Sequence, residues 1–266
     1  MESVGVPIKD WDVEIYRGVL TGYNEAFIIN SEKRNEILDN CADDSERERT
    51  AAIIRPILRG RDIKRYGYDF ADQYIIATFP SKHYNIDDYQ SLKSYLLSFG
   101  MERLEQTGKE YVIDGERVKA RKKTNNKWFE TQDSISYWDE FSKTKIVWGN
   151  LNVIGSYALA PENMFINAPS CMIVPGSKYL LAALNSKVVD YYIRTLGVVR
   201  NGGFFEYKPM FVEKIPIPKI SLEQEMAFNE ILSSPQVDSE KNAEIDKLMG
   251  SLYGLSIEEI IFLQNQ

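Results

Sequence analysis

The sequence predicts an α+β fold in which strands dominate the first part of the chain and helices dominate the end. Short apolar or β-branched runs, typical of strands, lie at residues 11–16, 73–79, 145–150, 156–159 and 168–174. An apolar stripe at helical spacing follows over residues 178–195, and two capping boxes, SLEQ and SIEE, mark helices after residue 220. Strands followed by helices are typical of α+β chains, whereas regular alternation would indicate a parallel sheet.

The composition is that of an ordinary globular protein. The chain has 266 residues, of which 44% are hydrophobic, and its mean hydropathy is −0.34. This length accommodates one large domain or two small ones. No apolar run approaches the length of a membrane span, and the first residues lack the basic and apolar segments of a signal peptide. We therefore expect no membrane contact.

Cysteine and histidine usage limits the available chemistry. Cys41 and Cys171 form no Cys-x-x-Cys pair, so we expect no structural zinc and a reducing cytoplasm as the natural compartment. His83 is the only histidine, which removes most histidine-based catalysis. The sequence also lacks a glycine-rich cofactor loop, a Gly-x-Ser-x-Gly elbow and a convincing nuclease core. We expect a binding module without catalytic residues, metal or cofactor in this chain.

The excess negative charge lies at the end of the chain. The net charge is −7, and residues 221–266 alone carry nine acidic and two basic residues, so the rest is neutral. A neutral body with a local cationic face can bind DNA, because phosphate interactions are local and screened. The proline-rich IPIP sequence at 215–218 marks a boundary. We expect a connector at 1–10, a recognition domain at 11–220, and an acidic helical tail at 221–266 that packs on this domain or its neighbour.

The first elements are easily read from local patterns. Residues 11–16 are expected to form a strand, and a loop with two glycines carries Thr21 and Asn24 before a second strand. Residues 31–40 fit a short helix with Ser31 as its N-cap. The charged residues 43–49 are expected to form a solvated loop.

Residues 53–66 carry the first concentration of cations. Pro56 favours an extended backbone before it, and Gly60 permits a tight turn, so a strand should end in an arginine-rich loop. Arginine pairs two-pronged with phosphate and with guanine. The candidates for DNA contact are Arg59, Arg61, Lys64 and Arg65. The alternative is a structural loop in which Asp62 neutralises Arg59 or Arg61.

The middle of the chain combines helix, hairpin and strand signals. Residues 87–99 have helical spacing and end at Gly100, a suitable C-cap. Asp114-Gly115 between apolar residues predicts a β-hairpin. Residues 135–141 look helical, and residues 145–150 read as a buried strand.

The second concentration of cations, residues 117–127, contains six basic residues and no acidic one. Lysine and arginine suit phosphate contact, and asparagine suits an adenine edge. The candidates here are Lys119, Arg121, Lys122, Lys123, Asn125, Asn126 and Lys127. Trp128 and Phe129 are expected in the core. A merely solvated basic face is the alternative. Five further residues are weaker candidates because the secondary-structure patterns place them on loops: Thr21, Asn24, Asn150, Arg200 and Asn201.

An ordered set of motifs resembles one known family. The motifs are GVLTGYNEAF (18–27), LRGRDIKRY (58–66), KWFETQ (127–132), KIVW (145–148), LLAALNSK (180–187), FFEYKP (204–209), IPIP (215–218) and LYGLSIEE (252–259). Together they resemble the TaqI-like C-terminal specificity domain, the target-recognition half of adenine-specific DNA methyltransferases and fused restriction-modification enzymes.

The resemblance implies a fold and a role. The fold is an α+β domain with an irregular, curved, strand-rich DNA-recognition region and a helical C-terminal portion. The implied partners are double-stranded DNA and an N-terminal methyltransferase or endonuclease domain of the same bacterial or archaeal parent. S-adenosylmethionine and Mg²⁺ would belong to that absent region. Residues of the recognition loops do not carry over from the resemblance. From their chemistry we expect Lys119, Arg121, Lys122, Lys123 and Lys127 to contact phosphates, and we expect Arg59, Arg61, Asn125 and Asn126 to be candidates for base edges.

Two alternatives stay open. The chain could be a protein-interaction or scaffold domain in a phage-defence assembly, with its basic loops facing an acidic partner. It could also be an enzyme whose active site is not apparent from motifs.

Overall fold

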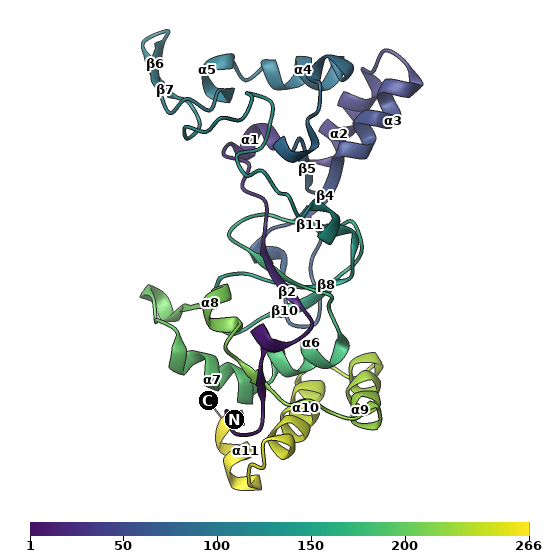
Figure 1. The fold of residues 1–266 in the computed structure, drawn as a ribbon, viewed down its shortest axis with the longest axis vertical. Helices are drawn as coiled ribbons and strands as arrows, with labels where there is room; N and C mark the ends of the chain where they lie inside the picture. Colours follow the sequence, from purple (N-terminus) through teal and green to yellow (C-terminus); the bar gives the residue numbers. More distant parts are fainter. Residues whose placement is uncertain (266) are drawn as a thin grey trace.

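A four-stranded antiparallel sheet occupies the middle of the molecule, between two mainly helical lobes (Figure 1). The structure, a computed structural model, describes residues 1–265. The sheet has the order β10-β8-β12-β2, formed by β10 (Tyr157–Ala160), β8 (Lys145–Trp148), β12 (Cys171–Val174) and β2 (Glu14–Arg17). Ile146, Trp148 and Ile173 face one hydrophobic cluster, while Val147 and Met172 face another. This period of two explains why both central strands are apolar throughout.

A second sheet leads from the centre into the lobe drawn at the top of Figure 1. Its order is β11-β4-β5-β3, formed by β11 (Phe165–Ile166), β4 (Ile54–Leu58), β5 (Tyr74–Ile76) and β3 (Ile28–Ile29). Only β11 and β4 are parallel. The strands predicted near residues 53 and 73 are therefore present, and the turn η2 (Gly60–Asp62) follows β4 as expected.

Short helices cover this second sheet. They are α1 (Asn24–Phe27), α2 (Ser31–Asp39), α3 (Asp44–Ile53), α4 (Gln90–Leu97) and α5 (Met101–Leu104), with 3-10 turns η3 (Pro80–Lys82) and η4 (Ile86–Asp88). The predicted hairpin projects beyond them as β6 (Glu110–Ile113) and β7 (Glu116–Lys119). Asp114 and Gly115 at its turn have φ of 52° and 85°, which an Asp-Gly turn accommodates.

Two local predictions in this lobe are wrong. Residues 43–49, expected to be a solvated loop, begin helix α3, because the Asp43 side chain caps the helix by accepting from Glu46 N at 2.7 Å. Buried Glu46 in turn accepts from Ala42 N. The cap of α2 is Asn30 instead of Ser31, whose hydroxyl donates to Asp72 at 2.7 Å.

The other lobe is built from α6 (Lys178–Asn185), α7 (Lys187–Leu196), α8 (Pro209–Val212), α9 (Leu222–Ser233), α10 (Asp238–Leu252) and α11 (Ile257–Gln264). The stripe expected as one helix over 178–195 is two helices, because Ser186 has an extended backbone and its side chain caps α7. Both predicted capping boxes, at Ser221 and Ser256, are present. This arrangement of separate sheets followed by helices confirms the α+β class.

Short ladders connect distant parts of the chain. Strand β1 (Val6–Pro7) pairs with β14 (Pro216–Ile217), and β9 (Leu151–Asn152) pairs with β13 (Phe205–Glu206). Three further 3-10 turns complete the described structure: η1 (Ile8–Asp10), η5 (Trp138–Ser142) and η6 (Asn201–Gly203). Ile8 is buried, so the expected connector packs against the domain. Within residues 1–265, no helix is long and apolar enough to cross a membrane.

Candidate nucleic-acid interface

A groove lies beside α8, where the ends of central strands β2 and β8 face residues 199–210. Two adjoining cavities, of about 550 Å³ and about 630 Å³, form it and share Asn150, Pro169 and Lys208 in their lining. The groove brings together three predicted residues from two separate loops: Asn150 from one, and Arg200 and Asn201 from the other. We refer to it below as the interlobe groove.

The groove floor depends on a close approach of two backbones. Gly18 N donates to Ser170 O at 2.8 Å, and Val19 N donates to Ile166 O at 2.8 Å. A Cβ atom at Gly18 would lie 2.6 Å from Ile166 O. Gly18 is therefore required for strand contact, and the loop after it carries Leu20 to the groove edge.

Asn150 lies at the centre of the groove with a defined orientation. It follows β8, its backbone carbonyl accepts from Tyr207 N at 2.7 Å, and its Oδ1 accepts from the Cys171 thiol at 3.1 Å. Burial raises the pKa of Cys171 to about 12, so the thiol remains a donor at neutral pH. With Oδ1 engaged, the Nδ2 group retains two donors for a ligand in the groove.

One wall of the groove carries two cations joined by a buried carboxylate. Glu206 accepts from Arg200 Nε at 2.6 Å and pairs with Lys208 Nζ at 2.8 Å. Hydrogen bonds from Lys208 and Arg200 lower the pKa of Glu206, so the carboxylate stays charged. The two cations keep exposed surface while their positions are fixed, which suits contact with phosphate.

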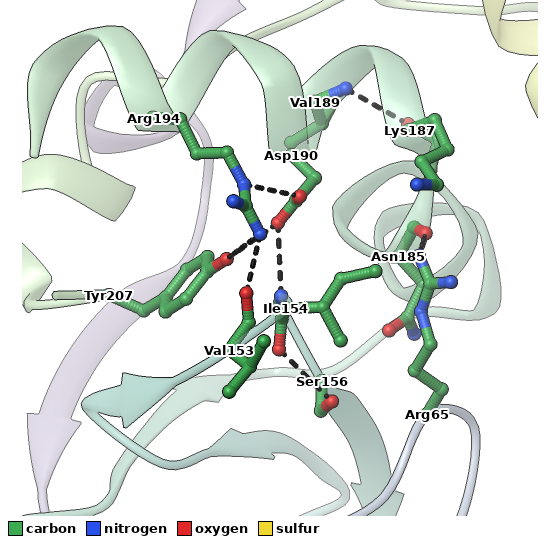
Figure 2. Close-up of polar contacts among 12 residues, drawn as sticks. Arg65, Val153, Ile154, Ser156, Asn185, Lys187, Val189, Asp190, Arg194 and Tyr207 are labelled. Atoms are coloured by element: carbon green, nitrogen blue, oxygen red, sulfur yellow. Dashed lines mark hydrogen bonds and ion pairs between the residues drawn. The ribbon is translucent and has the colours of Figure 1, made fainter. Parts of the chain in front are cut away.

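A buried polar network supports this wall (Figure 2). Asp190 on α7 accepts from Gly155 N at 2.9 Å, from Tyr207 OH at 2.7 Å and from Arg194 Nε at 2.8 Å. Arg194 also donates to Val153 O at 2.6 Å. The network holds α7 against residues 153–155 and against Tyr207, which in turn bonds Asn150.

The opposite wall contains Arg17, Leu20 and Asp133. Arg17 ends strand β2 and is exposed. Burial raises the pKa of Asp133, and the charges of Arg17 and Lys122 oppose this rise. Lys122, a predicted phosphate contact, is exposed and does not belong to the lining of either cavity.

The first cationic stretch divides into structural and free residues. Arg59 donates Nε to Asp62 Oδ2 at 2.9 Å and Nη2 to Asp62 Oδ1 at 2.8 Å. Burial alone would raise the pKa of Asp62, but hydrogen bonds from Arg59 lower it overall. The structural-loop alternative therefore describes Arg59, and the base-edge role predicted for it loses its support. Arg61 and Lys64 are exposed.

The turn at η2 packs close to the groove floor. A Cβ atom at Gly60 would lie 3.1 Å from Ser170 Oγ. Arg65 points elsewhere, since its Nη2 donates to Asn185 O at the end of α6 (Figure 2). The half-buried Arg65 thus satisfies a helix C-terminus, and its predicted DNA contact is replaced by a packing role.

The second cationic stretch contains a clear correction. Arg121 is only 4% exposed, and its guanidinium donates to the carbonyls of Leu104, Thr21, Glu130 and Trp128. Burial lowers its pKa to about 10. The phosphate contact predicted for Arg121 is contradicted by this burial, because four of the five guanidinium N–H donors bond carbonyls in the core.

Two amide or hydroxyl candidates are also occupied. Buried Thr21 donates its hydroxyl to Asn24 Oδ1 at 2.6 Å, and Asn126 Nδ2 donates to the carbonyls of Thr131 and Gln132. These contacts shape the loops, whereas the exposed Asn24 keeps its Nδ2 group available and stays a predicted contact.

The remaining predicted residues of this stretch are exposed: Lys119, Lys122, Lys123, Asn125 and Lys127. Phe129 is buried and Trp128 is half-buried, as the core interpretation predicted. Arg17, Leu20 and Lys208 were not predicted as site residues. Lys208 lies within the FFEYKP motif, and this motif is the sequence feature that could have indicated it. No such feature marks Arg17, because its position depends on strand pairing between β2 and β12.

The family of TaqI-like C-terminal specificity domains matches residues 55–217 of the sequence. The chain belongs to this family. The match includes the groove residues Asn150, Arg200 and Lys208, and membership supports a role in DNA recognition.

Two solved structures share the fold of this specificity domain. The type IIL restriction-modification enzyme MmeI, described in complex with DNA, superposes with a TM-score of 0.63 at 14% identity, over 97% of this chain and 35% of the enzyme. The type IIG restriction endonuclease BpuSI superposes with a TM-score of 0.60 at 13% identity, over 100% of this chain and 31% of the enzyme. The chain thus spans about a third of each enzyme. No curated protein matches the sequence.

Proposed function

We propose that the chain is the duplex-DNA target-recognition domain of a restriction-modification or methyltransferase enzyme. The observation that carries the proposal is the interlobe groove, where an oriented asparagine amide lies among cations supplied by strand β2 and by the segment between α7 and α8. Membership of the specificity-domain family supports the same conclusion.

Some groove residues would position the protein on the DNA backbone, and others would read the base sequence. Arg17, Arg200 and Lys208 would contact phosphates along its walls, because charge contacts with the backbone set register without reading bases. Asn150 Nδ2 would donate to an acceptor on a base edge, such as purine N7. Leu20 and Met210, both exposed beside the groove, would contact a thymine methyl group.

The exposed predicted residues extend this surface. Lys119, Lys122, Lys123 and Lys127 would add phosphate contacts along the upper lobe, and Arg61 and Asn125 remain candidates for base edges. The domain would present the target adenine to a catalytic domain of the same cytoplasmic parent, where S-adenosylmethionine and Mg²⁺ would bind.

The test is selection of the purified chain against a randomised duplex library. We expect an enriched motif, and Asn150→Ala should relax one position of it at a cost of about 1–3 kcal/mol. Lys247→Gln, which removes an exposed charge on α10, is the matched control and should leave the motif unchanged. An identical motif and affinity for Asn150→Ala would contradict the assignment of Asn150, and failure to retain DNA even at low salt would contradict the function itself.

One observation favours the protein-interaction alternative. A cavity of about 630 Å³ between α7 and α11 is lined by the exposed aromatic residues Tyr191 and Phe262. Exposed aromatic surface is typical of protein contacts. On the recognition hypothesis, this surface would face the catalytic domain. Tight binding of an acidic protein partner together with no affinity for DNA would favour the alternative.

A further inference from the structure

A second cationic pocket lies outside the interlobe groove. It has a volume of about 400 Å³ and is enclosed by α3, β4, η3, η5 and the chain before β11. In Figure 1, α3 and β4 lie on the side of the molecule away from α8 and the β6–β7 hairpin. Arg55, which belongs to the first cationic stretch but has no part in the groove, contributes to this pocket.

The pocket has an unbalanced positive charge. Arg49, Arg55 and Lys82 line it, and its lining contains no carboxylate. Within residues 1–265, none of these three side chains forms an ion pair; Arg49 donates only to Ser45 Oγ and to the backbone carbonyl of Asp88. Cations gathered around one concave surface create a local positive potential that favours an anion.

The remaining surface of the pocket is largely aromatic. Phe79 and Phe165 form buried parts of the lining, while Tyr84 and Trp138 are half-buried at its sides. Lys82 Nζ lies 3.1 Å from the centroid of the Trp138 ring, which holds this cation beside the aromatic wall. Aromatic rings next to cations are the combination that proteins use to stack a base while binding its phosphate.

A polar group completes the pocket. Asn163 lies in its lining with a φ of 61°, and its backbone N donates to Phe141 O at 2.9 Å, so the residue is held in place. Its amide has no hydrogen-bond partner within the described chain, and an asparagine amide can pair with the edge of a base.

We propose that this pocket binds a single nucleoside phosphate, with the phosphate on Arg49 and Arg55 and the base against Tyr84 and Trp138. The volume fits one nucleotide and lies within the ordinary range for small-ligand pockets. The nucleotide has two potential sources, a free mononucleotide or one unit of an unpaired DNA strand. Both present the same chemistry to the pocket.

The test is calorimetric titration of the full chain with dAMP, deoxyadenosine and inorganic phosphate. We expect saturable binding of dAMP and at least about tenfold weaker binding of the other two, because each lacks half of the contacts. Trp138 should report dAMP by a change in fluorescence, and Trp138→Phe should remove that change. Absence of saturable dAMP binding would overturn the proposal.

Charge variants locate the site. Arg55→Gln and Lys82→Gln should each weaken dAMP binding by about tenfold or more. Arg47→Gln, on the same helix α3 as Arg49 but paired with Asp39 outside the pocket, is the control and should bind as the parent does. Thermal unfolding establishes that each variant is folded. If folded Arg55→Gln and Lys82→Gln bind dAMP as well as Arg47→Gln does, the proposal is wrong.

Competition distinguishes the two sources. If a short single-stranded oligonucleotide displaces dAMP and binds with higher affinity than dAMP, the pocket holds one unit of a DNA strand. If the oligonucleotide does not displace dAMP, the pocket holds a free nucleotide. Asn150→Ala should leave dAMP binding unchanged, so the pocket and the interlobe groove are tested separately.

Discussion

Arg121 and Lys122 are neighbours in the chain but have opposite environments. The guanidinium of Arg121 is buried among carbonyl groups, whereas Lys122 is exposed. A buried donor group that satisfies several carbonyls stabilises the fold, and its removal leaves those carbonyls unpaired. An exposed lysine contributes little to stability but contributes to phosphate binding.

These environments predict opposite effects of mutation. Arg121→Met should lower the free energy of unfolding by about 3 kcal/mol, because four carbonyl groups lose their donor. Lys122→Gln should leave unfolding unchanged but weaken DNA binding. Urea denaturation and fluorescence anisotropy on both variants check this pair. A stable Arg121→Met protein would contradict the structural role.

Cys171 is also defined by its environment. Burial raises the pKa of its thiol to about 12, above the ordinary value of 9.0. Only the thiolate reacts with alkylating reagents, so the Cys171 thiol of the native protein should resist alkylation at pH 8. The rate of alkylation should rise only as the pH approaches 12. The measurement uses iodoacetamide on the Cys41→Ser variant, which leaves one thiol. Rapid labelling of native protein at pH 8 would contradict the burial of Cys171.

At the scale of elements, α7 acts as a support for the groove wall. Asp190 connects this helix to Gly155 N and Tyr207 OH, and Tyr207 N bonds the carbonyl of Asn150 (Figure 2). The support is specific because Asp190 is buried, and its removal leaves buried donors and its half-buried helix neighbour Arg194 without their acceptor. A mutation on α7 should therefore alter the geometry of the groove wall.

We predict that Asp190→Ala lowers the free energy of unfolding by about 3 kcal/mol and weakens DNA selectivity, although Asp190 does not line the groove. Thermal unfolding and library selection measure the two effects. Glu230→Ala on α9, an exposed position, is the control and should change neither. If Asp190→Ala is less stable but keeps its DNA selectivity, contacts other than those of Asp190 hold the groove wall in place.

At the scale of the whole molecule, the groove exists only because segments distant in sequence come together beside α8. Arg17 comes from the end of central strand β2, and Arg200 and Lys208 come from the segment between α7 and α8. Each phosphate contact contributes to the salt dependence of binding in proportion to the counterions it releases. The acidic tail lies mainly at the far end of the lower lobe, at a distance from the groove (Figure 1).

The slope of log affinity against log salt should therefore fall by about 1 for Arg200→Gln. Lys247→Gln in the acidic tail should leave the slope unchanged. Fluorescence anisotropy over a series of KCl concentrations provides the measurement. Equal slopes for Arg200→Gln and the parent would exclude Arg200 from phosphate contact.

Several local elements and the family could be predicted from the amino-acid sequence alone. Strand periodicity at residues 145–148, the Asp114-Gly115 turn and the capping boxes at Ser221 and Ser256 depend on neighbours within a few residues, and all are present. The ordered motifs predicted the specificity-domain family, which the match over residues 55–217 confirms.

Which polar residues remain free depends on the folded structure. Arg59, Thr21 and Asn126 are engaged by near neighbours in the chain, Arg65 and Arg121 are engaged by distant segments, and Asn150, Arg200 and Lys208 converge on the groove. The physical reason is that burial and hydrogen-bond partners come largely from chain segments distant in sequence: Arg121 bonds Thr21, and Asn150 bonds Cys171. No local pattern specifies these contacts, so a cationic run predicts charge but not accessibility.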